Sequence, residues 1–446
     1  MDPLGYGVAT SSYQIEGAVD VDGRGPSIWD TFCAVPGTIA DGTDGSVACD
    51  SYRRWDDDLS LLQELGVTAY RFSVAWPRIQ PTGSGAVEPR GLDYYERMVD
   101  TLLDAGIRPF PTLYHWDLPQ ALEDAGGWPV RETALRFADY AAVVAERLGD
   151  RVRDWATMNE PWCSAFLGYA AGVHAPGRRE PESAYAAAHH LLLGHALARD
   201  AIRTTHTGAQ VGIVLNVTAV HAETDGDQAA AGFVDAVQNR LWLDPLVSGR
   251  YPQALSAVRA LTADGVVQGG DLARISGALD WLGVNYYTPF RIGTDPDAAR
   301  AVGQAADAYP YAPSFVFRPH APRTEMGWEI DETGLTQTLL VAARLLPGVP
   351  LRVTENGAAF ADAVVDEDGT VRDDDRVDYL QRHLAAVDLA RAEGAPVVDY
   401  FAWSLMDNFE WAEGYRKTFG LVQVDPGTQD RRPKASFRWY AGRARS

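Results

Sequence analysis

The sequence is poor in positive charge. Its 39 Lys and Arg residues face 61 Asp and Glu residues, so the 446-residue chain carries a formal net charge of −22. Lys417 and Lys434 are the only lysines. Nucleic acids and anionic membrane surfaces are bound through clusters of basic residues. We therefore expect neither nucleic acid nor a membrane among the partners of this protein.

Cysteine and long apolar segments are also scarce. Cys33, Cys49 and Cys163 form an odd set without C-x-x-C spacing, which argues against a disulfide framework and favours a reducing compartment. No apolar run reaches the ~20 residues that a membrane-spanning helix needs. Residues 1–7 lack the basic and apolar regions of a signal peptide. These features together predict a cytoplasmic protein.

Metal-binding and nucleotide-binding motifs are missing as well. His189, His190 and His195 lie in one predicted helix but lack the H-E-x-x-H spacing of zinc enzymes, so we expect them to pack or cap. The segment from Gly5 to Gly7 lacks the helix-opening context of a phosphate-binding glycine turn. We expect no metal ion and no organic cofactor.

What the sequence does contain is a regular alternation of short apolar runs and helical patterns. The predicted strands are 4–9, 67–72, 109–113, 152–158, 211–216, 279–286, 351–354 and 398–403. Helical patterns lie between them, at 55–65, 92–105, 131–148, 184–205, 333–346 and 375–393. Strand–helix units in this number predict an α/β fold, a single (β/α)8 barrel domain over residues 1–446. An open doubly wound sheet is the alternative, but it would be expected to carry the missing glycine turn.

The chain is longer than a minimal barrel, so the extra residues must form loops. The obvious insertions are 29–51, 168–181 and 288–323. In such barrels the active site lies on the C-terminal face, where the loops that follow the strands meet. The prediction is therefore a barrel with long loops on that face.

Polar or aromatic residues stand at or just after the end of every predicted strand. In chain order they are Gln14, Arg71, His115 with Trp116, Asn159 with Glu160, Asn216, Asn285 with Tyr287, Glu355, and Trp403 with Glu410 and Trp411. Because the strand ends of a barrel share one face, we expect these side chains to converge on one pocket.

Two glutamates stand out among them. Pro161 disfavours the α region for the residue before it, so we expect Glu160 to be extended at a strand end. Glu355 precedes Asn356-Gly357, a turn signal, and also ends a strand. We expect the fourth and seventh strands to lie on opposite sides of the barrel, with the two glutamates facing each other.

Paired carboxylates that flank a bond are the machinery of glycoside hydrolysis. A separation of about 5–5.5 Å gives retention of configuration, and about 6.5–9.5 Å gives inversion, so the sequence alone leaves both open. Sugars also need polar partners for their hydroxyls and an aromatic surface for their C–H faces. Gln14, His115, Asn159 and Glu410 would supply the first, and Trp403 and Trp411 the second.

The chain resembles the β-glucosidases of glycoside hydrolase family 1. The segments that carry the resemblance are ATSSYQIEGA (9–18), SIWDTF (27–32), YRFSVAWPRI (70–79), YHWDLPQAL (114–122), NEPW (159–162), NYYTP (285–289), VTENGAA (353–359) and WSLMDNFEW (403–411). The resemblance implies a retaining enzyme that hydrolyses terminal non-reducing β-D-glucosyl residues of small β-glucosides and oligosaccharides by double displacement.

The resemblance also implies a role for each matching residue. Glu160 would be the acid/base and Glu355 the nucleophile. The other matches are Arg71 and Tyr287 beside the nucleophile, with Asn285 close by; Gln14, His115, Asn159, Glu410 and Trp411 around the sugar hydroxyls; Trp403 as the stacking floor; and Trp328 as a wall of the leaving-group site. Trp116, beside His115, is a further candidate for substrate binding.

Simple electrostatics agrees with these roles. Arg71 and the Tyr287 hydroxyl would stabilise the negative charge of Glu355. Burial and the charge on Glu355 should raise the pKa of Glu160, so that it donates a proton first and accepts one afterwards. Once Glu355 is glycosylated, its charge is gone and Glu160 should become more acidic.

Other activities of the same pocket remain open. They include β-galactosidase- or β-fucosidase-type hydrolysis and transglycosylation, in which a sugar hydroxyl replaces water. A 6-phospho-β-glycosidase would need a cationic phosphate site, and the carboxylate of Glu410 would repel phosphate there. A non-catalytic sugar-binding barrel would be expected to lack one of the two glutamates, and both are present.

Overall fold

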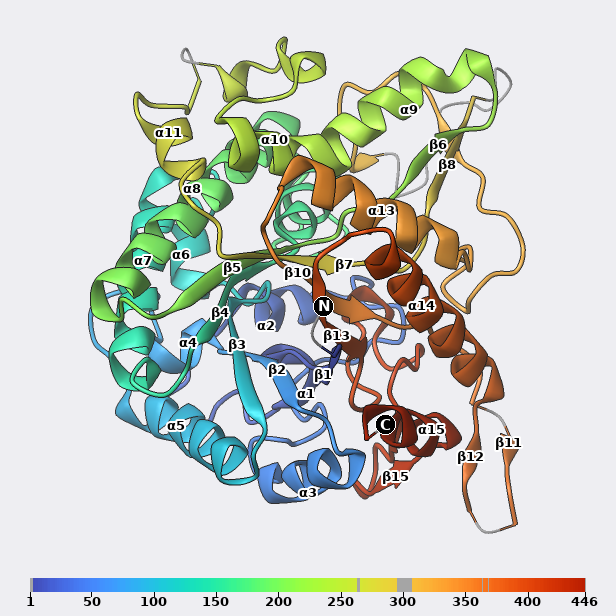
Figure 1. The fold of residues 1–446 in the computed structure, drawn as a ribbon. Helices are drawn as coiled ribbons and strands as arrows, with labels where there is room; N and C mark the ends of the chain where they lie inside the picture. The colour runs from blue at the N-terminus through green and yellow to red at the C-terminus, as the bar shows by residue number, and fades with distance from the viewer. Residues whose placement is uncertain (1–2, 263–264, 295–306, 363, 368, 446) are drawn as a thin grey trace.

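A closed ring of parallel strands forms the centre of the molecule (Figure 1). The computed structural model describes residues 3–262, 265–294, 307–362, 364–367 and 369–445. Around the ring the order is β1-β13-β10-β7-β5-β4-β3-β2. These strands are β1 (Gly5–Ala9), β2 (Ala69–Ser73), β3 (Arg108–Tyr114), β4 (Asp154–Asn159), β5 (Gln210–Leu215), β7 (Trp281–Asn285), β10 (Leu351–Asn356) and β13 (Val397–Trp403). The predicted (β/α)8 barrel is confirmed.

Long helices cover the outside of the ring and follow the strands in turn (Figure 1). They are α3 (Trp55–Leu65), α5 (Pro89–Asp104), α7 (Arg131–Leu148), α8 (Pro181–Thr205), α9 (Gln228–Asp235), α10 (Leu241–Ser248), α13 (Glu332–Leu345), α14 (Asp374–Ala392) and α15 (Ala435–Ala444). The helix α3 shows why these segments are helical: three aspartates occupy its first turn, where the helix dipole favours negative charge, and Gly66 ends it in a left-handed conformation.

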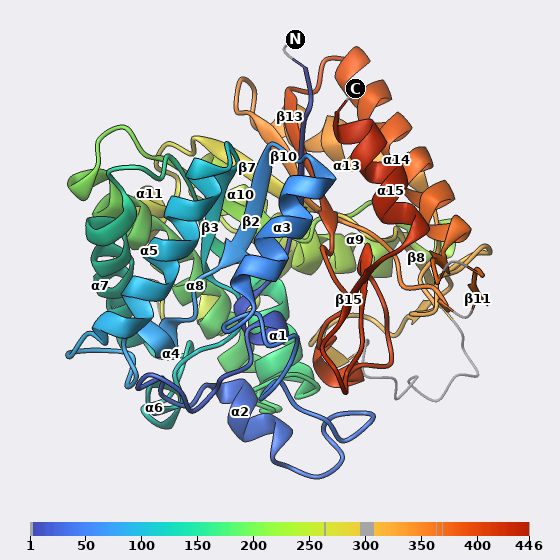
Figure 2. The ribbon, with the colours of Figure 1, turned by 90° about the horizontal axis from the view of Figure 1, so that it is seen from below.

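Shorter helices, turns and small sheets lie in the segments that connect the barrel strands and the long helices. The helical ones are α1 (Ser12–Ile15), α2 (Ile28–Cys33), α4 (Trp76–Ile79), α6 (Gln120–Asp124), α11 (Asp271–Ile275), the π-helices η1 (Cys163–Ala171) and η3 (Ala236–Arg240), and the 3₁₀ turns η2 (Asp225–Asp227), η4 (Gln253–Leu255), η5 (Arg259–Leu261) and η6 (Trp411–Glu413). The small sheets consist of β6 (Val220–Ala222), β8 (Phe290–Gly293) and β9 (Val316–Phe317), of β11 (Val364–Val365) and β12 (Val371–Arg372), and of β14 (Val422–Val424) and β15 (Arg431–Pro433). Figure 2 places α2, α4 and α6 at one end of the barrel, away from the N-terminus.

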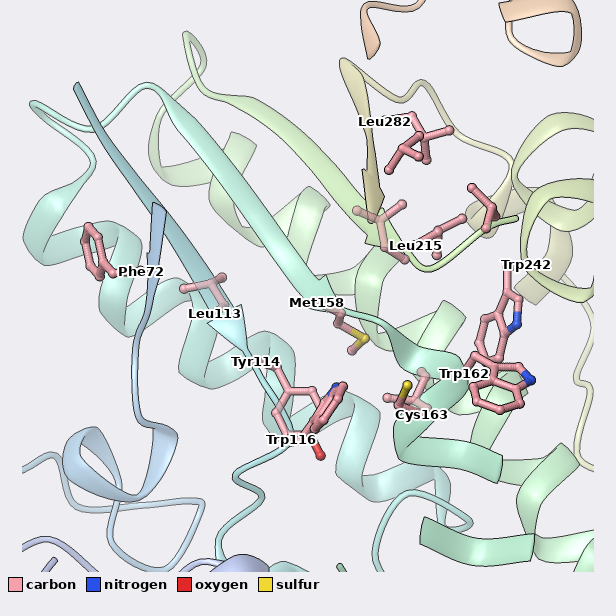
Figure 3. Close-up of a cluster of buried hydrophobic side chains, with 14 of the residues drawn as sticks. Phe72, Leu113, Tyr114, Trp116, Met158, Trp162, Cys163, Leu215, Trp242 and Leu282 are labelled. Atoms are coloured by element: carbon pink, nitrogen blue, oxygen red, sulfur yellow. The ribbon is translucent and has the colours of Figure 1, made fainter. Parts of the chain in front are cut away.

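The barrel strands are buried on both faces, as in other parallel sheets. Inside the ring a core cluster contains Ala9, Ala69, Phe110, Ala156, Val214, Trp281, Ala359, Phe401, Trp403 and Phe419. Outward-facing side chains pack beneath the helices, and Figure 3 shows Phe72, Leu113, Met158, Leu215 and Leu282 from five successive strands of the ring. The interior is therefore a packed core, and a ligand site can form only at its ends.

The N-terminal end of the barrel is closed by ion pairs. Arg352 contacts Asp399 and also lies 2.8 Å from Asp154, while Arg108 lies 2.6 Å from Asp399. These carboxylates already have charged partners, which leaves the opposite end of the barrel for chemistry.

The predicted strands match the observed ones to within a few residues, but one expectation about their placement is wrong. The fourth and seventh barrel strands, β4 and β10, are not on opposite sides of the ring, because only β5 and β7 separate them. They are three steps apart in the ring of eight, one step short of directly opposite, so the two glutamates still approach each other across the barrel mouth. Of the predicted insertions, 29–51 begins within α2 and 288–323 contains β8 and β9, while residues 295–306 lie outside the described part.

Over the described residues, no helix combines the length and the apolar character that crossing a membrane requires.

Candidate active site

A cavity of about 540 Å³ opens at the C-terminal ends of the barrel strands. Most of the residues predicted from the sequence line it: His115, Trp116, Asn159, Glu160, Asn285, Tyr287, Trp328, Glu355, Trp403, Glu410 and Trp411. Gln14 and Arg71 are predicted site residues that do not line the cavity. With Gln14 and Arg71 included, these predicted residues come from seven of the barrel strands and the loops that follow them.

Glu355, in β10, has a charged and a strong neutral donor on its two carboxylate oxygens. The Arg71 Nη1 donates to Oε1 at 2.6 Å, and the Tyr287 hydroxyl donates to Oε2 at 2.6 Å. Arg71 is fully buried, so it supports Glu355 from behind the cavity wall. Hydrogen bonds from a charged donor are about twice as strong as neutral ones. The arrangement stabilises Glu355 as an anion.

Glu160 follows β4 directly and has only neutral donors. The Asn285 Nδ2 donates to its Oε1 at 2.7 Å, and the Cys163 thiol donates to its Oε2 at 3.1 Å. Burial and the negative charge of Glu355 raise the pKa of Glu160 to about 7. The raised pKa and both of its causes agree with the expectation from the sequence. A carboxyl group with this pKa can give and take a proton near neutrality.

The backbone of Glu160 differs from its predicted extended form. Its φ is 42°, in the left-handed region, because helical structure begins at Pro161 and the chain must turn from strand to helix at this one residue. Trp116 and Trp411 also have positive φ, of 76° and 48°. Non-glycine residues rarely adopt this conformation, and such strain gathers at functional sites. All three side chains line the cavity.

A chain of hydrogen bonds joins the two glutamates through Asn159. The Asn159 Oδ1 accepts from Arg71 Nη2 at 2.6 Å and from Asn285 Nδ2 at 3.0 Å. Arg71 contacts Glu355 and Asn285 contacts Glu160, so the chain runs unbroken from one carboxylate to the other. The positions of the two carboxylates are therefore coupled by rigid, buried groups.

His115 lines the cavity and has an unused donor. The amide Nδ2 of Asn159 donates to its Nε2 at 3.0 Å, so the ring hydrogen lies on Nδ1. Nδ1 is buried and has no partner among the described residues. Burial and the nearby charge of Arg71 lower the pKa of His115 well below its usual value, so the ring is neutral. Buried polar atoms are normally paired, and this one is free for a ligand hydroxyl.

Glu410 also lines the cavity and has an unused acceptor. Its Oε2 is buried and has no partner within the described part of the chain. Burial, together with the charges of Glu355 and Glu160, raises the pKa of Glu410 to about 8. The neutral carboxyl can both donate and accept hydrogen bonds, which suits a hydroxyl group.

Aromatic rings surround these polar atoms. The rings of Trp403 and Trp411 are stacked on that of His115, with centroids 6.0 and 5.9 Å away. The ring of Trp328 packs against that of Tyr287, with centroids 5.5 Å apart. A cavity with convergent polar groups and aromatic walls fits a small, hydroxyl-rich ligand.

Comparison with known proteins agrees with this chemistry. The model of glycosyl hydrolase family 1 matches residues 3–446. The chain belongs to glycosyl hydrolase family 1. It is a glycoside hydrolase, and the family resemblance read from its motifs is confirmed.

Named relatives span nearly the whole chain. A "bifunctional beta-D-glucosidase/beta-D-fucosidase" of Bifidobacterium breve is 50% identical over 444 residues, which cover 98% of this chain and 96% of the relative. "Beta-glucosidase A" of Thermotoga maritima is 46% identical over 440 residues, covering 98% and 95%. Among solved structures, a family 1 β-glucosidase from Thermotoga maritima matches with a TM-score of 0.92 at 43% identity, covering 100% of this chain and 98% of that one.

Two predicted site residues of this family 1 enzyme, Gln14 and Trp116, donate their side-chain N–H groups to other parts of the protein. The amide Nε2 of Gln14 donates to Asn408 Oδ1 at 3.0 Å and to Phe409 O at 2.9 Å, so its hydrogens already have partners. The Trp116 indole donates to the Asn159 carbonyl at 2.9 Å, which leaves its ring surface for the cavity. Gln14 fixes the loop that carries Glu410, and its role toward a sugar hydroxyl stays a prediction.

Sequence reasoning missed some cavity residues. Cys163 lines the cavity, and its hydrogen bond to Glu160 was not predicted from the sequence. A helix that starts at Pro161 places the third residue after Glu160 near its side chain, which is the signal that was available. His174, Phe290, Tyr309 and Phe317 also line the cavity and come from segments without a diagnostic motif, Phe290 from β8 and Phe317 from β9.

The histidines of α8 make ordinary structural contacts. His189 Nε2 lies 3.0 Å from Asp271 Oδ2, and His195 Nδ1 lies 2.7 Å from the Thr157 hydroxyl. Across the described residues no cluster of His, Cys, Asp and Glu has the arrangement of a metal site.

Proposed function

We propose that this family 1 glycoside hydrolase is a retaining β-glucosidase. Its substrates would be small β-glucosides and oligosaccharides with a terminal non-reducing β-D-glucosyl residue. The observation that carries the proposal is the contrast between the two glutamates: Glu355 is held by Arg71 and Tyr287, whereas Glu160 has a raised pKa. The names of the relatives in Bifidobacterium and Thermotoga support glucose as the sugar.

The first half of the reaction uses both glutamates at once. Glu160, in its protonated form, gives its proton to the glycosidic oxygen, and the aglycone leaves as an alcohol. A carboxylate oxygen of Glu355 attacks the anomeric carbon from the opposite face and forms a covalent glycosyl-enzyme. Arg71 and Tyr287 position Glu355 for this attack.

The second half reverses the role of Glu160. With Glu355 esterified, Glu160 takes a proton from water, and the hydroxide attacks the anomeric carbon. The bond to Glu355 breaks, its carboxylate is restored, and the sugar leaves with its original configuration. A sugar hydroxyl can take the place of water, so we include transglycosylation in the proposal.

The remaining predicted residues would hold the substrate. We assign the sugar hydroxyls to Gln14, His115, Asn159, Glu410 and Trp411, the stacking floor to Trp403, the leaving-group wall to Trp328, and supporting contacts to Trp116 and Asn285. Nδ1 of His115 and Oε2 of Glu410 support this assignment, since each is buried without a partner in the described part of the chain.

A second activity, β-D-fucosidase, is favoured by the name of the Bifidobacterium relative. D-Fucose carries a methyl group in place of the primary alcohol of D-galactose, so it also tests whether Glu410 reads that end of the sugar. A 6-phospho sugar would bring further negative charge toward Glu410, where the charges of Glu355, Glu160 and Glu413 already disfavour the ionised carboxyl group.

A panel of 4-nitrophenyl β-D-glucoside, β-D-galactoside, β-D-fucoside and 6-phospho-β-D-glucoside tests the proposal. We expect the highest kcat/KM for the glucoside or the fucoside and the lowest for the phosphorylated sugar. Proton NMR of the first product should show the β-anomer. A first product in the α-form, or a preference for the phosphorylated sugar, would overturn the proposal.

We also propose that residues 1–446 act as one catalytic domain in the cytoplasm. The first barrel strand pairs with the last one, from Gly5 opposite Asp399 to Ala9 opposite Trp403, so the barrel closes only with both ends of the chain. Cys33, Cys49 and Cys163 are free thiols, which supports a reducing compartment. Limited proteolysis tests whether the chain behaves as one domain, and cell fractionation tests its location.

A further inference from the structure

The thiol of Cys163 is the closest sulfur donor to the proposed acid/base. Cys163 is the first residue of the π-helix η1, and Figure 3 shows it beside Trp162, beyond the strand that carries Met158. Its Sγ lies 3.1 Å from Glu160 Oε2, and its side chain is buried in the cavity wall. π-Helical turns are rare and occur often at functional sites.

The direction of this hydrogen bond is fixed by the neighbours of Cys163. Burial and the negative charge of Glu160 raise the pKa of the Cys163 thiol well above its usual value, so the sulfur keeps its hydrogen. The Asn216 Nδ2 donates to Sγ at 3.6 Å. Since the sulfur already accepts from Asn216, its own hydrogen is left for Glu160.

The other oxygen of Glu160 is held by a group that cannot change its role. Asn285 Nδ2 uses its two hydrogens on Glu160 Oε1 and Asn159 Oδ1, at 2.7 and 3.0 Å. Its Oδ1 accepts from the Thr354 hydroxyl at 2.7 Å. A proton on Oε1 would point at an N–H group, whereas the S–H bond of Cys163 can rotate away from Oε2.

We propose that Cys163 is a positioning residue for Glu160: its thiol directs the transferable proton to Oε2 and sets how readily Oε2 releases it. The inference rests on the proposed role of Glu160 as acid/base. When Glu160 is ionised, the thiol donates to Oε2; when Glu160 is protonated, the thiol rotates and the sulfur faces the new O–H group. The thiol is a weak donor, so it steadies the carboxylate without abolishing its basicity.

Other charged or titratable groups also act on this pair and are held constant in the test. Glu160 interacts with Glu355, Arg71, Tyr287 and Glu410, and Cys163 with Glu355 and Tyr309. None of them is altered by a substitution at position 163.

The test is the alkaline limb of the kcat/KM pH profile, measured for wild type, Cys163→Ala, Cys163→Val and Cys163→Ser with an alkyl β-glucoside. Alanine and valine remove the donor, and valine also excludes water from the vacated space. We expect both to move the limb to higher pH by roughly half a unit, a ~threefold gain in relative rate on the alkaline side. Serine keeps a donor, so its limb should lie at or below that of the wild type.

Two controls separate this effect from a change in packing. Cys33→Ser removes a thiol outside the cavity lining and should leave the limb in place. With 2,4-dinitrophenyl β-glucoside, whose leaving group needs no proton, the shift should disappear from kcat/KM. A structural role for Cys163 would affect both substrates alike.

Coincident limbs for wild type, Cys163→Ala and Cys163→Val would overturn the inference, as would a serine variant that follows alanine. These outcomes differ from failure of the proposed function, in which the wild-type enzyme would not turn over β-glucosides at all.

Discussion

The two carboxylates of the cavity have opposite surroundings. Glu355 receives hydrogen bonds from the Arg71 guanidinium and the Tyr287 phenol, both at 2.6 Å. Glu160 receives them from an amide at 2.7 Å and a thiol at 3.1 Å. The same side chain is thus stabilised as an anion in one place and given a raised pKa in the other. The neighbouring groups, and not the residue type, determine which glutamate is suited to act as the nucleophile and which as the acid.

The strongest way to break this contrast is to remove the anion. We expect Glu355→Ala to lower kcat by about 10⁵-fold or more, because no covalent intermediate can form. The fold should survive, as circular dichroism and thermal melting would show. Hydrolysis of an aryl β-glucoside is the measurement, and wild-type activity in this variant would disprove the assignment.

Added formate or azide distinguishes the two glutamates further. In Glu355→Ala the small anion would occupy the vacated space and attack in place of the carboxylate, so an azide product should have the α-configuration. A β-configured azide would place the nucleophile elsewhere.

Removal of Glu160 should have a smaller effect that depends on the leaving group. We expect Glu160→Ala to lower kcat/KM by about 10²- to 10⁴-fold for alkyl β-glucosides, which need a proton, and far less for the 2,4-dinitrophenyl glucoside. The alkaline limb of the pH profile reports the loss of a proton from Glu160, whose pKa is about 7, so this limb should also vanish in the variant. Here azide should give a β-glucosyl azide. Equal losses for both substrates would contradict acid catalysis.

Much of this contrast was accessible from the sequence, since strand periodicity and the polar strand ends placed Glu160 and Glu355 at one rim. Their relative placement was also implied, because the barrel strands follow one another around the ring in chain order, which puts the fourth and seventh three steps apart. The left-handed conformation of Glu160 was hidden: Pro161 disfavours only the α region before it, and the tertiary structure chose between the remaining alternatives. The bond from Cys163 depends on a π-helix, which has no clear sequence signal.

A more subtle change weakens the support of the anion and keeps its charge. Tyr287→Phe removes one hydroxyl that donates to Glu355 and leaves the ring that packs on Trp328. Hydrogen bonds to charged groups contribute about 1.5–3 kcal/mol, so we expect kcat to fall roughly 10- to 100-fold. Steady-state kinetics give the answer. Tyr309→Phe is a matched control expected to spare kcat for the same aryl glucoside, because the Tyr309 hydroxyl donates to Gln238 and not to Glu355. An unchanged kcat in Tyr287→Phe would show that Arg71 alone is sufficient to support Glu355 as the nucleophile.

The smallest expected effect is the most direct test of how the glutamates communicate. The charge of Glu355 helps to raise the pKa of Glu160 to about 7, so neutralising that charge should lower it. Glu355→Gln mimics the neutral, esterified nucleophile, and we expect the pKa of Glu160 to fall by about one unit. The carboxyl ¹³C chemical shift of Glu160, followed through a pH titration, measures it. At pH 7 the group would then change from a partly protonated acid to a carboxylate base, as the second half of the reaction requires. An unshifted pKa would mean that burial alone sets its value and that the switch from acid to base has another cause.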